Sequence, residues 1–213
     1  MEYMLKADDM VGVTFWIISV AMIASTAFFF LESNSVAKHW ATSVRVAGLV
    51  TLIAAVHYYY MRHVWISTGE NPNVYRYIDW LLTVPLQMVE FYLILAAVGA
   101  ATAGMFWRLL IGTLVMLIAG FLGESGQINA TVGFIVGIAG WVYILYEVFA
   151  GEAAQASASS NSDAQKTAFS AMKWIVSIGW SIYPIGYFLG YLAGGTDEST
   201  LNLVYNVADI INK

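Results

Sequence analysis

The sequence predicts an all-α membrane protein, a seven-transmembrane-helix bundle that forms one domain over residues 1–213. Hydrophobic residues make up 60% of the chain and charged residues 11%, whereas soluble domains are about 25% charged. The mean hydropathy is +0.69. A chain this apolar cannot cover its surface with polar groups, so lipid must be its main solvent. A soluble enzyme domain is therefore excluded, and a net charge of −5 without a basic patch excludes a nucleic-acid binder.

Apolar stretches long enough to cross a bilayer follow one another along the chain. A hydrocarbon core of about 30 Å requires about 20 apolar residues per helix. Six stretches meet this requirement: 11–31, 41–64, 74–97, 106–122, 128–149 and 168–193. A seventh begins near Leu201 and reaches Lys213 after 13 residues, which would rise only about 20 Å as a helix. We therefore expect the chain as given to end within its last span.

The remaining segments connect or precede these spans. The start, MEYMLKADD, lacks the basic-then-apolar pattern of a signal peptide, so we expect the first stretch to be a retained span. Residues 151–166 are rich in Ala, Ser, Asn and Gln without apolar periodicity, which predicts a flexible loop on the cytoplasmic side. The chain has no cysteine, which excludes disulfides and thiolate metal sites, and we expect no metal.

Basic residues near the span ends predict the orientation, because cytoplasmic loops carry an excess of Lys and Arg. The loops after odd-numbered spans hold Lys38, Arg45, Arg108, Lys166 and Lys173. The opposite side holds only Lys6 and Arg62 and is richer in acids. This asymmetry places the amino terminus outside and the carboxyl end of the seventh span in the cytoplasm, in a cell (inner) membrane.

Ionisable side chains inside the spans mark the functional candidates, because each costs about 2.5–3.5 kcal/mol on insertion scales. Two further acids, Glu124 and Glu147, lie at span ends, where contact with water is the simpler interpretation. The candidates inside the second, third and seventh spans are His57, Arg76, Asp79, Glu90, Asp209 and Lys213.

The spacing along the third span places two carboxyls on one face. Asp79 and Glu90 are 11 residues apart, a rotation about 20° past three full turns and a rise of about 16 Å. Thr83 lies between them on nearly the same face, and Gln87 lies at its margin. With the orientation above, Asp79 is in the outer half and Glu90 in the inner half. Two acids placed in this way are typical of a proton path.

The seventh span pairs an acid with an amine. Asp209 and Lys213 are four residues apart, on one helical face. A desolvated amine is the usual nucleophile toward a carbonyl, with which it forms a Schiff base. The alternative is a lysine whose ammonium reaches the membrane interface. Two buried acids require a buried cation, and Arg76 is the only other one nearby, which favours a buried Lys213.

Three segments resemble the microbial (type 1) rhodopsins, and most closely the proteorhodopsin branch of light-driven proton pumps. They are RYIDWLLTVPLQMVEFY from Arg76, WSIYP at 180–184 and DIINK at 209–213. The resemblance covers essentially all seven spans. It implies a light-driven outward proton pump that absorbs blue light through all-trans retinal.

The resemblance also implies roles for the candidates. Lys213 would bind retinal as a protonated Schiff base, with Asp79 as counter-ion and proton acceptor. Asp209 would be the second counter-ion, Glu90 the proton donor, and Arg76 the stabiliser of the outer charge cluster. Together with Asp79 and Glu90, Thr83 completes the Asp-x3-Thr-x6-Glu pattern of the proton pumps in this family. The residues that would line the chromophore are Trp80, Trp180, Tyr183 and Pro184.

Two residues have both a family role and a simpler interpretation. By resemblance, His57 pairs with Asp79 and can meet Trp16 of a neighbouring protomer in a homo-oligomer, a pentamer or hexamer. A lone intramembrane histidine can equally be a helix-to-helix hydrogen-bond donor. In this family a glutamine at Gln87 accompanies blue absorption and a leucine green, although Gln87 could also serve only a hydrogen bond within the bundle.

Two other functions are compatible with seven spans. A slow-cycling photosensory rhodopsin would share the scaffold, but the carboxyl of Glu90 favours pumping because it supplies fast reprotonation. A ligand receptor without covalent retinal would share the hydropathy but lack the pair of Asp209 and Lys213. Sodium and chloride pumps are disfavoured by the pattern of Asp79, Thr83 and Glu90.

Overall fold

A computed structural model describes residues 4–213, and within that part of the chain all regular structure is helical. The first five spans are single helices: α1 (Met10–Glu32), α2 (Lys38–Thr68), α3 (Asn73–Ala96), α4 (Ala103–Glu124) and α5 (Ala130–Phe149). A short helix follows, α6 (Glu152–Ala158). The sixth span consists of α7 (Asp163–Trp174), η1 (Ile175–Gly179), α8 (Ile182–Tyr187) and η2 (Phe188–Leu192), and the seventh is α9 (Glu198–Asn212). The predicted seven-helix bundle is confirmed.

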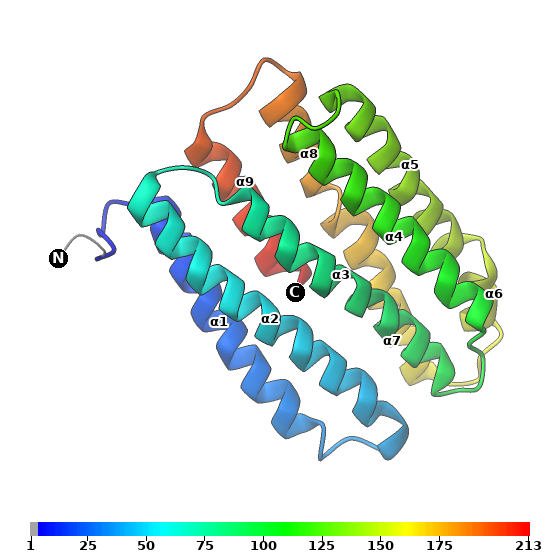
Figure 1. The fold of residues 1–213 in the computed structure, drawn as a ribbon. Helices are drawn as coiled ribbons and strands as arrows, with labels where there is room; N and C mark the ends of the chain where they lie inside the picture. Colours follow the sequence, from blue (N-terminus) through cyan, green and yellow to red (C-terminus); the bar gives the residue numbers. More distant parts are fainter. Residues whose placement is uncertain (1–3) are drawn as a thin grey trace.

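The long helices run side by side and alternate in direction along the chain (Figure 1). In this view α1 and α2 form one edge of the bundle and α4 and α5 the other, with α3 between them. Helix α9 ends near the middle of the bundle rather than at one of its two ends. Lys213, which follows α9, is therefore brought to the centre of the molecule.

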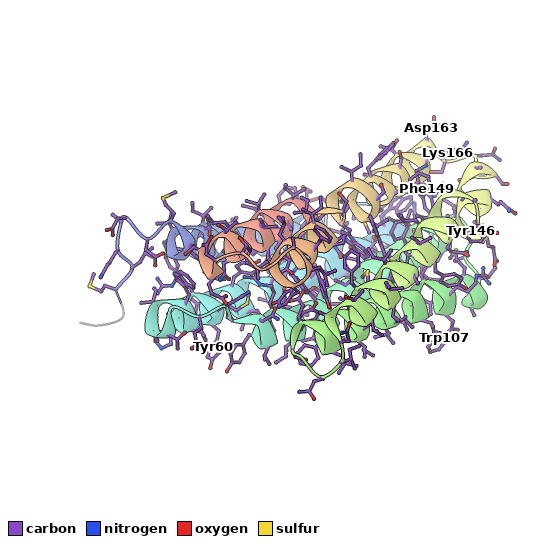
Figure 2. All side chains as sticks on the ribbon, turned by 90° about the horizontal axis from the view of Figure 1, so that it is seen from above. Tyr60, Trp107, Tyr146, Phe149, Asp163 and Lys166 are labelled. Atoms are coloured by element: carbon purple, nitrogen blue, oxygen red, sulfur yellow. The ribbon has the colours of Figure 1, made fainter. Side chains whose placement is uncertain are left out.

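The outer surface of the bundle is apolar, as a lipid environment requires. Six of the spans are long and apolar enough to cross a membrane within the described residues. The labelled aromatic side chains of Tyr60, Trp107, Tyr146 and Phe149 point away from the helices in Figure 2. We conclude that the chain is a multi-pass membrane protein, as predicted.

The segment 151–166, expected to be a flexible loop, is helical for most of its length. Helix α6 occupies Glu152–Ala158, and α7 already begins at Asp163. Alanine has the highest helix propensity, and the Ser162 hydroxyl caps α7 by accepting a hydrogen bond from the Gln165 backbone N–H. The buried Gln165 side chain also donates to the Ser157 hydroxyl at 3.1 Å. Gly151 and residues 159–162 are the parts of this segment that remain as connections.

The sixth span changes helical type twice. The π-helical segments η1 and η2 flank α8, which contains Pro184. A π-helical turn leaves carbonyls out of α-helical register, and the carbonyl of Val176 in η1 accepts a hydrogen bond from the Trp141 indole at 2.7 Å. The span is thus held against α5 at the point where its regular hydrogen bonding is interrupted.

Glu147 is not in contact with water, contrary to the sequence-based expectation. It is buried at the end of α5, and both its oxygens accept from Arg108 of α4, at 3.0 and 3.1 Å. Arg108 also pairs with Glu152 of α6. A positive partner at the right distance makes burial of the carboxylate tolerable.

Candidate functional site

A buried ammonium between two buried carboxylates forms the centre of the site. Lys213 Nζ donates to Asp79 of α3 and to Asp209 Oδ2 of α9, the latter at 3.2 Å. The side chain of Lys213 is 2% exposed and those of both acids are 0% exposed. The structure places Lys213 in the interior and not at a membrane interface. These three residues, predicted separately from two spans, are brought together.

The two carboxylates differ in their other partners. Asp209 accepts from the hydroxyls of Tyr58 and Tyr183, each at 2.6 Å, and from the Trp80 indole at 3.0 Å. Within residues 4–213, Asp79 Oδ1 has no hydrogen-bond partner. Asp209 is therefore fixed by a full set of donors, whereas Asp79 retains an oxygen on which a proton can be placed.

Arg76 lies fully buried beside this centre. Its guanidinium donates to the Tyr58 hydroxyl at 3.0 Å and to the side-chain oxygens of Asn202 and Asn206 at 2.9 and 3.0 Å. Asn206 in turn donates to Thr14 of α1 at 2.9 Å. Arg76 thus reaches Asp209 through Tyr58 and contacts neither acid directly.

Beside Lys213 lies a cavity. The residues expected to surround a chromophore, Trp80, Gln87, Trp180, Tyr183 and Pro184, all line it. The rings of Trp80 and Tyr183 meet edge to face, with centroids 5.0 Å apart. The walls are therefore mostly aromatic and aliphatic, as is usual for a cavity that holds an apolar ligand.

Gln87 and Thr83 are oriented by backbone oxygens. The Gln87 amide donates to the carbonyl of Asn212, next to Lys213, at 2.7 Å. Asn212 uses its own amide to bind the carbonyl of Gly179 in η1, at 3.0 Å. The Thr83 hydroxyl donates to the backbone carbonyl of Asp79 at 2.9 Å and not to its carboxylate.

Glu90 and His57 lie at the margins of the centre. Glu90 is half-buried, and within the described part of the chain it forms no hydrogen bond or ion pair. His57 Nδ1 lies 3.8 Å from Asp79 Oδ1, beyond hydrogen-bond distance, and 2.9 Å from the Ile53 carbonyl. The structure supports an electrostatic relation of His57 to Asp79, but the direct hydrogen bond of the ring is to its own helix.

Comparison with known proteins identifies the family. The family model described as "Bacteriorhodopsin-like protein" matches residues 9–213. The chain belongs to this family of rhodopsins.

Three relatives agree with this assignment. This rhodopsin is 54% identical over 211 residues to the blue-light absorbing proteorhodopsin of Gamma-proteobacterium Hot 75m4, covering 98% of this chain and 84% of that protein. It is 52% identical over 210 residues to the green-light absorbing proteorhodopsin of Gamma-proteobacterium EBAC31A08, with the same coverage. The crystal structure of the blue light-absorbing proteorhodopsin from Med12 matches with a TM-score of 0.81 at 52% identity, over 96% of this chain and 92% of that one.

Membership of the rhodopsins implies a retinal chromophore, and the cavity of this rhodopsin fits one. Its described lining residues include a single primary amine, that of Lys213, at the point where two carboxylates can balance a positive charge. The remaining walls suit a long apolar polyene. Lys213 is the residue that would hold it covalently.

Several residues of the site were not found from the sequence. Asn202 and Asn206 bind Arg76, and their spacing of four along an apolar span was an available signal, because neutral amides in membranes seek partners. The sequence alone could not show which of three consecutive tyrosines, Tyr58, Tyr59 or Tyr60, enters the site. Tyr58 is 0% exposed, whereas Tyr59 and Tyr60 are 57% and 48% exposed.

Proposed function

We propose that this rhodopsin is a light-driven outward proton pump that absorbs blue light through all-trans retinal held by Lys213. One observation carries the proposal: the buried Lys213 lies between two carboxylates, of which only Asp79 keeps an oxygen without a donor in residues 4–213. The relatives at 52% and 54% identity are proteorhodopsins by name, which supports the same activity for this chain.

The site residues divide the work between the two sides of the membrane. Retinal held by Lys213 would supply light absorption and photoisomerisation. Asp79 takes up a proton toward the outer side, while Asp209 remains an anion held by Tyr58, Tyr183 and Trp80. Glu90, on the same face of α3 but in the inner half, holds the proton that is returned to the centre. Each charge moved outward against 100 mV costs about 2.3 kcal/mol, which light must supply.

We propose a cell membrane location with the amino terminus outside and the carboxyl end of α9 cytoplasmic. The excess of Lys and Arg after the odd-numbered spans supports this orientation. We also propose a homo-oligomeric ring, a pentamer or hexamer, in which Trp16 of one protomer approaches His57 of another. Both residues lie on the α1–α2 edge, and Trp16 is partly exposed there.

The blue colour is proposed from Gln87 rather than from overall similarity, because blue and green relatives are almost equally similar to this chain. Gln87 lines the cavity and its amide lies against the carbonyl of Asn212, the neighbour of Lys213. An oriented amide dipole at this end of the chromophore can stabilise one charge distribution of the polyene over another.

Illumination of unbuffered cells that contain the protein and retinal tests the pump. We expect the external medium to acidify, and a protonophore to abolish the signal. Asp79→Asn should abolish acidification, because it removes the acceptor, whereas Glu70→Gln, a change of an exposed acid, should leave it intact. A coloured protein that responds to light without sustained acidification would support a photosensor and overturn the pump.

A further inference from the structure

The connection between the fifth and sixth spans covers one end of the bundle, where α6 and α7 meet α3 (Figure 1). The proposed orientation makes this the cytoplasmic end. A surface pocket opens here between the segment that follows α3 and the connection itself. Four consecutive hydroxyl or amide side chains, residues 159–162, form one wall, and Val98, Ala100 and Ala156 form the rest. The pocket is thus accessible to water and offers it hydrogen-bond partners.

Two polar side chains lie behind this pocket. Ser157 is 6% exposed and Gln165 is 0% exposed, and they are the buried polar side chains of α6 and α7. Gln165 Nε2 donates to the Ser157 hydroxyl at 3.1 Å. Both adjoin the pocket wall, because Ser157 follows Ala156 and the Ser162 hydroxyl accepts from the Gln165 backbone N–H at 3.2 Å.

The other half of the Gln165 amide has no partner in the protein. Its Oε1 is buried and accepts no hydrogen bond from any group in residues 4–213. A buried amide oxygen without a donor costs free energy, and water is the usual donor where the protein supplies none. Because Ser157 fixes the amide nitrogen, the direction of Oε1 is also fixed, and this oxygen marks a place for a bound water.

Gln165 lies nearer to the pocket than Glu90 does. One turn further along α7, Phe169 packs edge to face on Phe91, the neighbour of Glu90, with ring centroids 5.4 Å apart. Glu90 lies six residues before the end of α3, about 9 Å along the helix axis. One hydrogen bond cannot span this distance. A proton that reaches Glu90 from the cytoplasm therefore requires an intermediate polar group, and Gln165 is placed to hold one.

We propose that Gln165 is a positioning residue for proton uptake from the cytoplasm. Its Oε1 binds a water that passes a proton from the pocket to Glu90, and Ser157 orients the amide for this task. The water accepts one proton on the pocket side and releases one to the Glu90 carboxylate, so atoms and charge balance. The inference rests on the proposed function, because it requires a pump in which Glu90 is the proton donor.

Flash spectroscopy of the retinal-loaded protein in lipid nanodiscs, with a pH-indicator dye in the medium, tests this role. Gln165→Met nearly keeps the shape of the side chain but removes the amide. We expect it to slow proton uptake about five- to tenfold, the rate equivalent of one lost hydrogen bond. The absorption maximum and the earlier transfer to Asp79 should be unchanged. Azide, a small weak acid that carries protons into the interior, should restore the rate.

Three further variants separate the amide oxygen from packing. Gln155→Met makes the same change on the exposed face of α6 and should leave uptake at the wild-type rate. Gln165→Glu retains a side-chain oxygen acceptor and should take up protons faster than Gln165→Met. Ser157→Ala removes the hydroxyl that orients the amide and should slow the same step by a smaller factor. If Gln165→Met does not fold, Ser157→Ala decides the question.

Uptake at the wild-type rate in Gln165→Met, or in Ser157→Ala where it replaces that variant, would overturn the proposal. Slow uptake that azide does not restore, or that accompanies an equal slowing of the transfer to Asp79, would show that Gln165 only supports the packing of α6 on α7. A wild-type pigment that neither releases nor takes up protons in light would instead contradict the proposed function.

Discussion

Asp79 and Asp209 approach the same ammonium but have different neighbours. Three donors surround Asp209 in addition to Lys213, whereas one oxygen of Asp79 has no donor among the described residues. Hydrogen bonds to a carboxylate stabilise its charged form. This difference, which arises because the donors to Asp209 come from α2, α3 and the sixth span, fits the separate tasks proposed for the two acids, fixed counter-ion and proton acceptor.

Gln87→Leu should move the absorption maximum to longer wavelength. The substitution removes the amide that donates to the Asn212 carbonyl beside Lys213 and leaves a buried carbonyl unpaired, at a cost of about 1–3 kcal/mol. We therefore also expect a lower thermal unfolding temperature. An absorption spectrum and a melting curve measure the two effects. Gln127→Leu, an exposed position between α4 and α5, is the matched control, and an unmoved maximum in Gln87→Leu would show that the residue does not set the colour.

At the scale of single residues, the sequence could identify charges but not their partners. An ionisable group in an apolar span is costly, so His57, Asp79, Glu90, Asp209 and Lys213 stand out in any hydropathy pattern. The partners of Arg76 are neutral amides, which stand out less. The hydrogen bonds of Glu124 to Tyr77 and Tyr205 were missed because it lies at a span end, where hydropathy does not distinguish water from a tyrosine cluster.

At the scale of elements, α3 illustrates which side-chain positions helical periodicity can predict. One helix carries Asp79 nearer its start and Glu90 nearer its end, on one face, and continues through Pro85. The spans were predictable because their length and apolarity follow from bilayer thickness. Helix α6 was not predictable in this way, because it has no apolar periodicity, and its order depends on alanine propensity and the pairing of Ser157 with Gln165.

The helix cap at the start of α9 predicts a dependence of stability on pH. This helix matters to the site because it carries Asp209 and ends at Lys213. Asp197 caps it, accepting from the Thr200 hydroxyl at 2.7 Å and from the Thr200 backbone N–H at 2.9 Å. These bonds hold the pKa of Asp197 below its usual value. A carboxyl group whose pKa is lowered by folding stabilises the folded protein at pH values above its ordinary pKa. This stabilisation is lost as the pH falls through the lowered pKa.

Asp197→Ala should therefore lower the thermal unfolding temperature at neutral pH, and its difference from wild type should disappear in strong acid. Melting curves recorded across this range measure the effect. Asp197→Asn is the control, because asparagine caps helices without titrating. A deficit of Asp197→Ala that stays constant down to strongly acidic pH would contradict the assignment of the cap.

At the scale of the whole molecule, the surface carries large aromatic side chains at both membrane borders. Tyr60 lies toward one end of the bundle, while Trp107, Tyr146 and Phe149 lie toward the end that holds Asp163 and Lys166 (Figure 2). Tyrosine and tryptophan favour the membrane–water interface. Exposed aromatic side chains alone therefore do not mark a contact between subunits. A test of the proposed homo-oligomer must separate a contact between subunits from a position at the membrane–water interface.

Trp16 and Trp107 provide that separation. Trp16 is 41% exposed on α1, with the Arg62 guanidinium 5.0 Å from its ring, and Trp107 is 57% exposed on α4 at the opposite edge of the bundle (Figure 1). Native mass spectrometry of the wild-type protein should show a pentamer or hexamer. Trp16→Ala should reduce the fraction of rings, because it removes the side chain proposed to meet His57 of the next protomer, whereas Trp107→Ala should not. Equal losses in both variants, or a monomeric wild type, would mean that the α1–α2 edge faces lipid and that His57 acts on Asp79 within its own chain alone.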